Sequence, residues 1–189
     1  MPKEAVNQLL KETDHRMLET IDAVKREFDA IRTGRANPAI LDRIRVEYYG
    51  QMLPINQVAT ITAPEPRMLV ISPWDKQVAK AIVDAITSSD LGLNPNSDGN
   101  IIRVPLPQLT TERRRELAKV AAKQTEEGKV AIRNIRRETV EKLRAMEKEG
   151  NISEDDRRRY QDQVQKVTDG HVEQLESVHT AKEREIMEG

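Results

Sequence analysis

The chain contains no cysteine in its 189 residues. Disulfide bonds and thiolate metal sites are therefore excluded, and the composition fits a reducing cytoplasm. No stretch approaches the roughly 20 apolar residues of a membrane-spanning helix, and the first residues lack the apolar run of a signal peptide. Aromatic residues are scarce, at 3%, whereas charged residues make up 33%. We expect a helical, heavily solvated cytoplasmic protein with no membrane partner and no large compact core.

Motifs for cofactors and catalysis are also missing. Neither GxxxxGK[ST] nor GxGxxG occurs, so no nucleotide-binding loop is expected. The pairs Glu12–His15 and Glu176–His179 resemble the Glu-x-x-His motif of di-iron bundles, but both point away from the apolar faces of their helices. His171 lies on an apolar face, where a hydrogen-bonded core histidine is expected. We predict no cofactor, no metal and no enzyme activity; a metal-dependent bundle oxidase is the alternative that elemental analysis would test.

Prolines divide the sequence into a middle segment and two flanks. Eight of the nine lie between Pro38 and Pro107, and helical periodicity occupies both flanks. The spacing predicts helices over about 3–32 and 111–149, and a third helix capped by Ser153. Gly128 is expected to permit close helix approach. Each helix is expected to pack through one apolar seam, and the seam of the first helix has coiled-coil-like spacing. The seam residues are Leu10, Met17, Ile21, Val24, Phe28 and Ile31 in the first helix; Leu117, Ala121, Gln124, Gly128, Ile132, Ile135, Thr139, Leu143 and Met146 in the second; and Tyr160, Val164, Val167, His171, Leu175 and Val178 in the third.

Between the first two helices lies a strand-rich segment. Residues 45–53 predict a hairpin turning at Gly50, and a helix is expected to begin at Ser72 with Pro73 in its first turn. Further strands are predicted at 58–63, 67–72 and 101–104, the last preceded by a turn at Asp98-Gly99-Asn100.

The predicted fold class is a two-domain α+β protein. A long antiparallel three-helix bundle is formed by residues 1–32 and 108–189, and a small α/β domain, residues 33–107, is inserted into it. The connecting segments are residues 33–35 and 104–107. Glycine in one and prolines in the other suggest a mobile joint, although prolines also stiffen a chain, so a fixed joint is the alternative.

A basic cluster on the second long helix is the most informative feature. Lys129, Arg133, Arg136 and Arg137 fall within about a third of the helix circumference. Like charges at these spacings cost about 0.2–0.5 kcal/mol per pair, so the cluster suggests a polyanion, and arginine matches phosphate in a bidentate manner. Residues 113–144 carry a net charge of +6 in a chain of net −1. A solvated basic face neutralised by neighbouring acids is the alternative.

Several strings along the whole chain resemble the bacterial ribosome recycling factor family. Glu138 departs from the pattern, since aspartate is expected after the paired arginines, but it keeps the charge. The matching strings are Ile31-Arg-Thr-Gly-Arg-Ala-Asn-Pro38, Glu47-Tyr-Tyr-Gly50, Ser89-Asp-Leu-Gly-Leu-Asn-Pro-Asn96, Ile102-Arg-Val-Pro-Leu-Pro107, Leu109-Thr-x-Glu-Arg-Arg114, Val130-Ala-Ile-Arg-Asn-Ile-Arg-Arg137 and Ile152-Ser-Glu-Asp-Asp156.

The resemblance implies an L-shaped, tRNA-like monomer that binds the large ribosomal subunit after termination. Elongation factor G and GTP would then drive subunit splitting and release of mRNA and tRNA, with initiation factor three linked to the outcome. Residues implied to contact ribosomal RNA are Arg133, Asn134, Arg136 and Arg137, with Lys129 added by geometry and Arg32 and Arg35 from the connecting segment. The implied hinge comprises Thr33, Gly34, Val104, Pro105, Leu106 and Pro107.

A scaffold or adaptor of another class stays open from the residues alone. In that case the basic stripe would meet an acidic protein, and binding would be indifferent to RNA competitors and independent of ribosomes.

Overall fold

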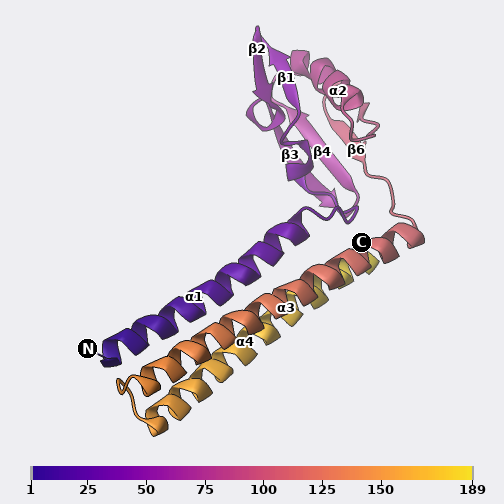
Figure 1. Ribbon diagram of the computed structural model, residues 1–189. Coiled ribbons are helices and arrows are strands. Elements are labelled where there is room, and N and C mark those ends of the chain that lie inside the picture. Colours follow the sequence, from indigo (N-terminus) through magenta and orange to yellow (C-terminus); the bar gives the residue numbers. More distant parts are fainter. Residues whose placement is uncertain (1, 189) are drawn as a thin grey trace. The chain divides into compact units, whose positions relative to one another are not determined.

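The computed structural model describes residues 2–188, which divide into two compact units (Figure 1). The first contains residues 2–31 together with Glu112–Glu188, and the second is Arg32–Thr111. Over the described residues, no helix combines the length and apolar character needed to span a membrane.

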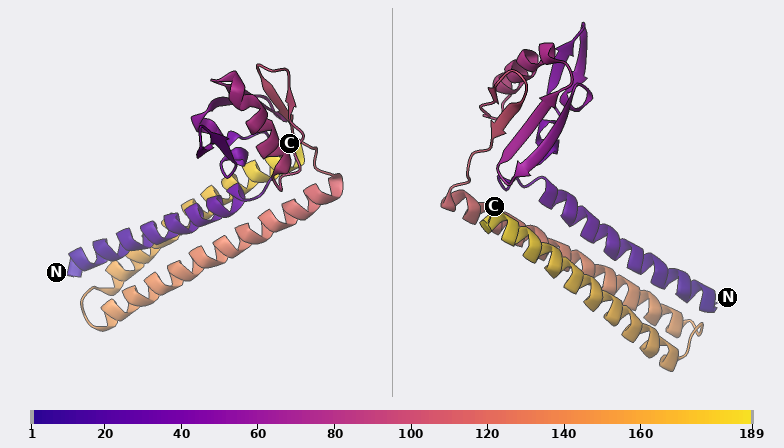
Figure 2. Two further views of the ribbon diagram at one scale, coloured as in Figure 1. Left: turned by 90° about the horizontal axis from the view of Figure 1, so that it is seen from above. Right: turned by 180° about the vertical axis from the view of Figure 1, so that it is seen from behind.

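The first unit is a bundle of three long helices, as predicted. They are α1 (Pro2–Asp29), α3 (Thr111–Lys148) and α4 (Glu154–Glu188), which run alongside one another in both views of Figure 2. The 38 residues of α3 correspond to a rod of about 57 Å. Ser153 caps α4 as expected, since its Oγ accepts a hydrogen bond from the backbone N–H of Asp156 at 3.0 Å.

The buried positions differ from the predicted seams in a systematic way. Leu10, Gln124 and Val167 are only partly buried, whereas Thr13, Thr125 and Thr168 lie fully inside. The predicted coiled-coil-like spacing of the first seam is confirmed from Met17 to Ile31, since all five seam residues there are buried. One buried set in each helix also recurs every eleven residues, a period of about 3.67. The repeats are Val6, Met17 and Phe28 in α1; Leu117, Gly128 and Thr139 in α3; and Val164, Leu175 and Ile186 in α4.

The three helices approach one another closely at Gly128. A Cβ atom at this position would lie 2.9 Å from Val24 Cγ2 of α1 and 3.0 Å from Leu175 Cδ2 of α4. Real Cβ atoms essentially never show contacts below 3.0 Å, so the absence of a side chain is required here. The predicted role of this glycine is confirmed.

The second unit contains two antiparallel sheets and one helix. Strands β1 (Arg45–Tyr48) and β2 (Gln51–Pro54) pair as the predicted hairpin. The two turn residues, Tyr49 and Gly50, have φ of 49° and 77°, which is the geometry of a two-residue primed turn. The larger sheet has the order β3-β4-β6-β5, with β3 at Ala59–Glu65, β4 at Met68–Pro73, β5 at Asn96–Ser97 and β6 at Ile102–Pro105.

Helix α2 (Ala79–Ser88) buries Ala79, Ile82 and Ile86 in the core of this unit. Its predicted start was wrong, because Pro73 is the last residue of β4. Asp75 instead caps a short 3₁₀ turn, Lys76–Val78, that precedes α2; its carboxylate accepts from the backbone N–H of Gln77 at 2.9 Å. A proline without an N–H is tolerated at the end of a strand as readily as at a helix start, which explains the error.

The predicted turn before β6 is present, and Asp98 organises it. The backbone N–H groups of Ile101 and Asn100 hold the pKa of the Asp98 carboxyl below its ordinary value, because they favour its charged form.

The connecting segments are more ordered than a free linker. Val104 and Pro105 belong to β6, where Val104 is fully buried and pairs with Leu69. Leu106 is also buried, and its N–H donates to the Arg67 carbonyl at 2.8 Å. The residues of the second segment that lie outside regular structure therefore begin at Leu106.

We predict that Gly128→Ala destabilises the bundle even though alanine is the better helix former. Val24 is β-branched and has little freedom to move away, so overpacking should outweigh the helix-propensity gain of about 1 kcal/mol and lower the free energy of unfolding by about 1–2 kcal/mol. Gly170→Ala in α4 is the matched control, because a Cβ there meets nothing within 4 Å. Urea unfolding should show the control stabilised; equal effects for both variants would contradict the close approach.

Candidate nucleic-acid interface

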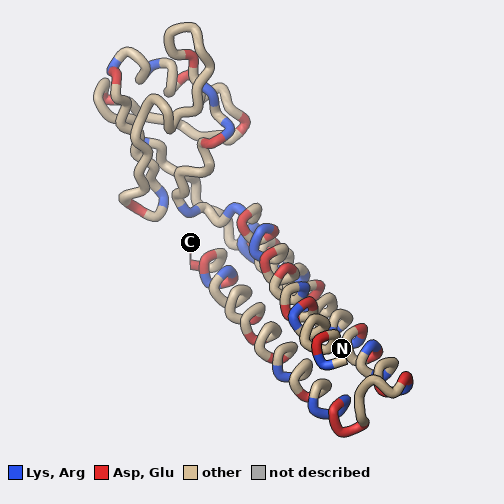
Figure 3. Tube along the Cα trace, turned by 90° about the vertical axis from the view of Figure 1, so that its left-hand side faces the viewer, with Lys and Arg blue, Asp and Glu red and all other residues tan. Residues whose placement is uncertain are grey.

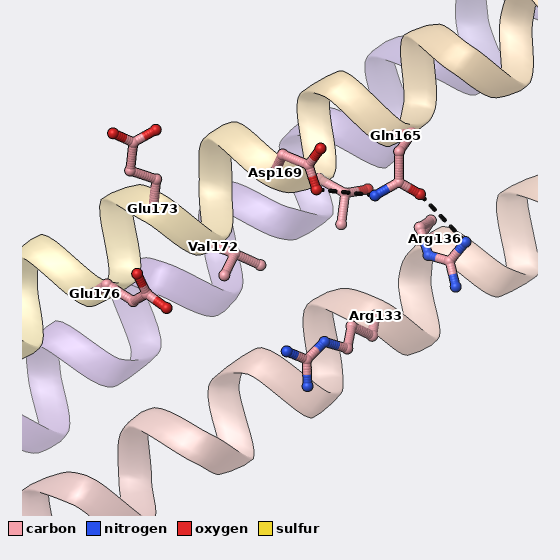
Figure 4. Close-up of a pocket in the computed structure, with 8 residues that line it drawn as sticks. Arg133, Arg136, Gln165, Asp169, Val172, Glu173 and Glu176 are labelled. Carbon is pink, nitrogen blue, oxygen red and sulfur yellow. Dashed lines mark hydrogen bonds between the residues drawn. The ribbon is translucent and has the colours of Figure 1, made fainter.

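The predicted RNA-contacting residues lie on a little over one turn of α3. Arg133, Asn134 and Arg137 are exposed, whereas Arg136 is only half exposed. Helical spacing distributes them over neighbouring parts of one face. Figure 4 shows the Arg136 side chain reaching Gln165 of α4, and the Arg133 side chain lying along α3. The basic residues are thus held on a rigid helix rather than on a loop.

Arg137 is the least restrained of these cations. Across residues 2–188 it forms no ion pair or side-chain hydrogen bond. Arg133 has only a long contact, 3.9 Å from Nη1 to Glu126 Oε1, between two half-exposed side chains. Pairs of this kind contribute about 0–1 kcal/mol. Both guanidinium groups are available to an incoming anion.

Arg136 is less exposed than Arg133 and Arg137. Its Nη1 donates to Oε1 of Gln165 on α4 at 3.4 Å, and Nε2 of Gln165 donates to Asp169 Oδ1 at 2.9 Å (Figure 4). The packing of α4 beside α3 covers one side of this arginine. It therefore sits at the border of the basic face, with its guanidinium oriented by the neighbouring helix.

Lys129 lies still closer to α4. Its side chain is 18% exposed, and Nζ forms an ion pair with Glu176 Oε1 at 3.0 Å. The structure thus places Lys129 in the groove between the helices and not on the outer face with Arg137. Its charge is already matched, so it could meet an RNA phosphate only by leaving Glu176.

The groove between α3 and α4 carries both signs of charge. Arg133 and Arg136 line one side, and Asp169, Glu173 and Glu176 line the other. Figure 3 shows that basic and acidic residues are mixed along the helices. The +6 charge of residues 113–144 is therefore partly offset locally by α4.

A second groove, between α1 and α3, borders the site at Asn134. Arg16 of α1 lies across it from Glu138 of α3, with Arg16 Nη1 and Glu138 Oε2 2.7 Å apart. Glu138 is the position that departs from the expected aspartate. In this chain its side chain joins two helices beside the basic cluster.

Sequence reasoning did not identify Gln165 and Asp169 as neighbours of the cluster. Their spacing of four residues indicated only that they share a face of α4. Which face of α4 meets Arg136 depends on the packing of the bundle.

Arg32 and Arg35 belong to the other unit, in the segment that follows α1. Both are exposed, while Thr33 between them is buried. Gly34 has φ of 79°, and the position of its missing Cβ lies 3.5 Å from Leu109 Cγ. The two connecting segments therefore approach each other. Contact of Arg32 and Arg35 with RNA stays a prediction separate from the α3 cluster.

The histidines have protein partners. His171, on the inner side of α4, lies with Nε2 2.7 Å from Asp14 Oδ1 of α1, as expected for a hydrogen-bonded core histidine. His15 and His179 each lie beside a glutamate four residues further on. Within residues 2–188, no group of three or more potential metal ligands forms.

Comparison with known sequences identifies the family. A family model described as ribosome recycling factor matches residues 24–187. The ribosome-recycling factor of Syntrophomonas wolfei is 52% identical over 183 residues, covering 97% of this chain and 99% of that protein. That of Pelotomaculum thermopropionicum is 53% identical over 181 residues, covering 96% and 98%. This chain belongs to the ribosome recycling factor family, which confirms the resemblance found in its motifs.

Solved structures agree with this assignment. A solution structure of the ribosome recycling factor aligns with a TM-score of 0.70 and 42% identity, covering 97% of this chain and 98% of that one. A second match has a TM-score of 0.61 and 44% identity, covering 96% and 98%. It represents the T. thermophilus ribosome recycling factor and E. coli elongation factor G bound to the E. coli post-termination complex. The predicted combination of a helix bundle and a small α/β domain is confirmed.

We predict that Arg137→Ala leaves the bundle as stable as before, within about 0.5 kcal/mol, because an exposed side chain without partners is removed. Arg157→Ala is the matched control. Arg157 is 17% exposed and contacts Glu147 at 3.1 Å and Gln161 at 2.9 Å, so its loss should cost about 1–2 kcal/mol. Denaturation followed by circular dichroism measures both; an equal cost for Arg137→Ala would assign that residue to the fold rather than to binding.

Proposed function

We propose that this protein splits post-termination ribosomes as a mechanical lever. It binds ribosomal RNA of the large subunit through the bundle, residues 1–32 and 108–189, and elongation factor G with GTP pushes it, so that the subunits separate and mRNA and tRNA are released. The observation that carries the proposal is the exposed arginine face of α3, on a chain whose family recycles ribosomes.

Binding would occur by phosphate neutralisation at Arg133 and Arg137. Both side chains project from a helix that is already folded, so little backbone ordering is required on binding. Asn134 lies between them and can donate or accept hydrogen bonds at a ribose or base edge. Arg136 adds a third cation at the border of the face, and Lys129 a fourth if it exchanges Glu176 for phosphate.

The second domain, residues 33–107, would receive the push. A relative in this family has been placed together with elongation factor G on a post-termination complex, which supports the same partner here. We infer that the joint consists of Thr33, Gly34 and the residues around Pro107, and that it transmits force between the domains. The protein would act in the cytoplasm as a monomer, hydrolyse nothing itself, and leave separated subunits for initiation factor three.

Arg137→Glu is expected to weaken binding to large ribosomal subunits roughly tenfold, because it replaces a phosphate contact with repulsion. The binding constant should also become less dependent on salt: the slope of its logarithm against the logarithm of salt concentration should decrease by about the contribution of one phosphate contact. Cosedimentation at several salt concentrations measures both effects, and light scattering of post-termination ribosomes with elongation factor G and GTP reports splitting.

Lys166→Glu on α4 is the control for this variant. Lys166 is exposed and the substitution changes the net charge equally, so it should affect binding much less. Equal losses for the two variants would favour a diffuse charge effect over a defined α3 site. Binding of an acidic protein by the parent chain that is indifferent to RNA competitors would favour the scaffold alternative.

Pro107→Gly is expected to slow splitting severalfold without a matching loss of affinity. Pro107 is exposed and outside β6, so the change softens the joint while the sheet survives. Replacing Val104, Pro105 or Leu106 would instead disturb the core. Pro95→Gly, in a loop that does not connect the domains, is the control. If Pro107→Gly lowers the splitting rate and the binding affinity to the same extent, the proposed role of the joint in transmitting force is contradicted.

A further inference from the structure

A chain of two hydrogen bonds links α4 to the basic face. Asp169 Oδ1 accepts from Gln165 Nε2 at 2.9 Å, and Gln165 Oε1 accepts from Arg136 Nη1 at 3.4 Å (Figure 4). Asp169 and Gln165 are one helical turn apart on α4, so they contact each other without help from other elements. Both are exposed, and neither is needed to fill the core.

Asp169 decides which way the Gln165 amide faces. A glutamine amide has an oxygen that accepts and a nitrogen that donates. Because a carboxylate only accepts, Asp169 draws the amide nitrogen toward itself and turns the oxygen toward Arg136. A guanidinium only donates, so this is the one amide orientation that suits both neighbours. Without Asp169 the amide could turn its N–H groups toward Arg136 and lose the contact.

We propose that Gln165 and Asp169 are positioning residues, which hold the Arg136 guanidinium at the edge of the α3 face before ribosomal RNA arrives. The inference rests on the proposed function, in which that face binds RNA. Holding a long arginine side chain in advance removes conformational entropy that binding would otherwise have to overcome. The long 3.4 Å contact orients the guanidinium weakly, leaving its other N–H groups for phosphate.

A simple charge argument gives the opposite expectation for Asp169. An acidic residue near an RNA-binding face repels phosphate, so its removal should strengthen binding. Glu176 is the internal comparison, because it lies on the same groove but pairs directly with Lys129. Removing Glu176 frees a cation and should strengthen binding. Removing Asp169 should weaken it, since the positioning of Arg136 is lost.

The test compares Asp169→Ala with Asp169→Asn. Asparagine removes the charge but keeps an oxygen that can accept from Gln165, so it should preserve positioning. We expect Asp169→Ala to weaken large-subunit binding about threefold, Asp169→Asn to bind at least as tightly as the parent protein, and Glu176→Ala to bind more tightly. In an Arg136→Ala background, Asp169→Ala should no longer weaken binding.

The free protein provides an independent readout. The Arg136 Nε–Hε group, observed by NMR in the full chain, should be ordered in the parent and in Asp169→Asn, and mobile in Asp169→Ala. Tighter binding by Asp169→Ala, or persistence of its effect when Arg136 is alanine, would overturn the positioning role while leaving the α3 site intact. If Arg136→Ala itself does not weaken large-subunit binding, both the use of Arg136 by the α3 site and this inference are overturned, whatever the NMR shows.

Discussion

The close approach of α1 and α4 to α3 at Gly128 is the constraint on which the rest of the bundle depends. Val24 and Leu175 occupy the space that a side chain at this position would need. With few large apolar residues, the helices gain contact area by approaching closely rather than by interlocking bulky side chains. A glycine in mid-helix costs about 1 kcal/mol in helix propensity, which the gained packing offsets.

This approach also fixes the rotation of α3 about its own axis, and therefore what α3 presents outward. Gly128, Ile132 and Ile135 face inward, so Arg137 faces away, and Arg133 lies at the edge of the groove toward α4. The neighbouring helix α4 then determines which of the basic side chains have partners within the bundle. Lys129 and Arg136 fall beside α4 and acquire acidic or amide partners, while Arg137 acquires none among residues 2–188. The basic residues of this one run therefore differ in their exposure and in their partners.

Much of this architecture could be predicted from sequence. Proline distribution separated the bundle from the inserted domain, Ser153 marked the start of α4, and Gly50 marked the hairpin turn. Periodicity placed the buried Thr139 in the predicted seam but missed Thr13, because threonine carries no apolar signal; the two Oγ1 atoms lie 2.6 Å apart inside the bundle. Pro73 misled because a strand end and a helix start accept proline equally. Contacts between helices, such as Arg136 with Gln165, need the packing itself.

The mixed charge of the α3–α4 groove bears on how a binding face can be both accurate and reversible. A purely basic surface would attract RNA strongly and with little selectivity among phosphates. Here α4 lowers the net charge and at the same time restricts where two of the cations can point. Under the proposed function, binding would then depend on the geometry of the exposed arginines more than on total charge. A factor that leaves the ribosome after each cycle would gain from that balance, because specificity is kept while non-specific affinity is held down.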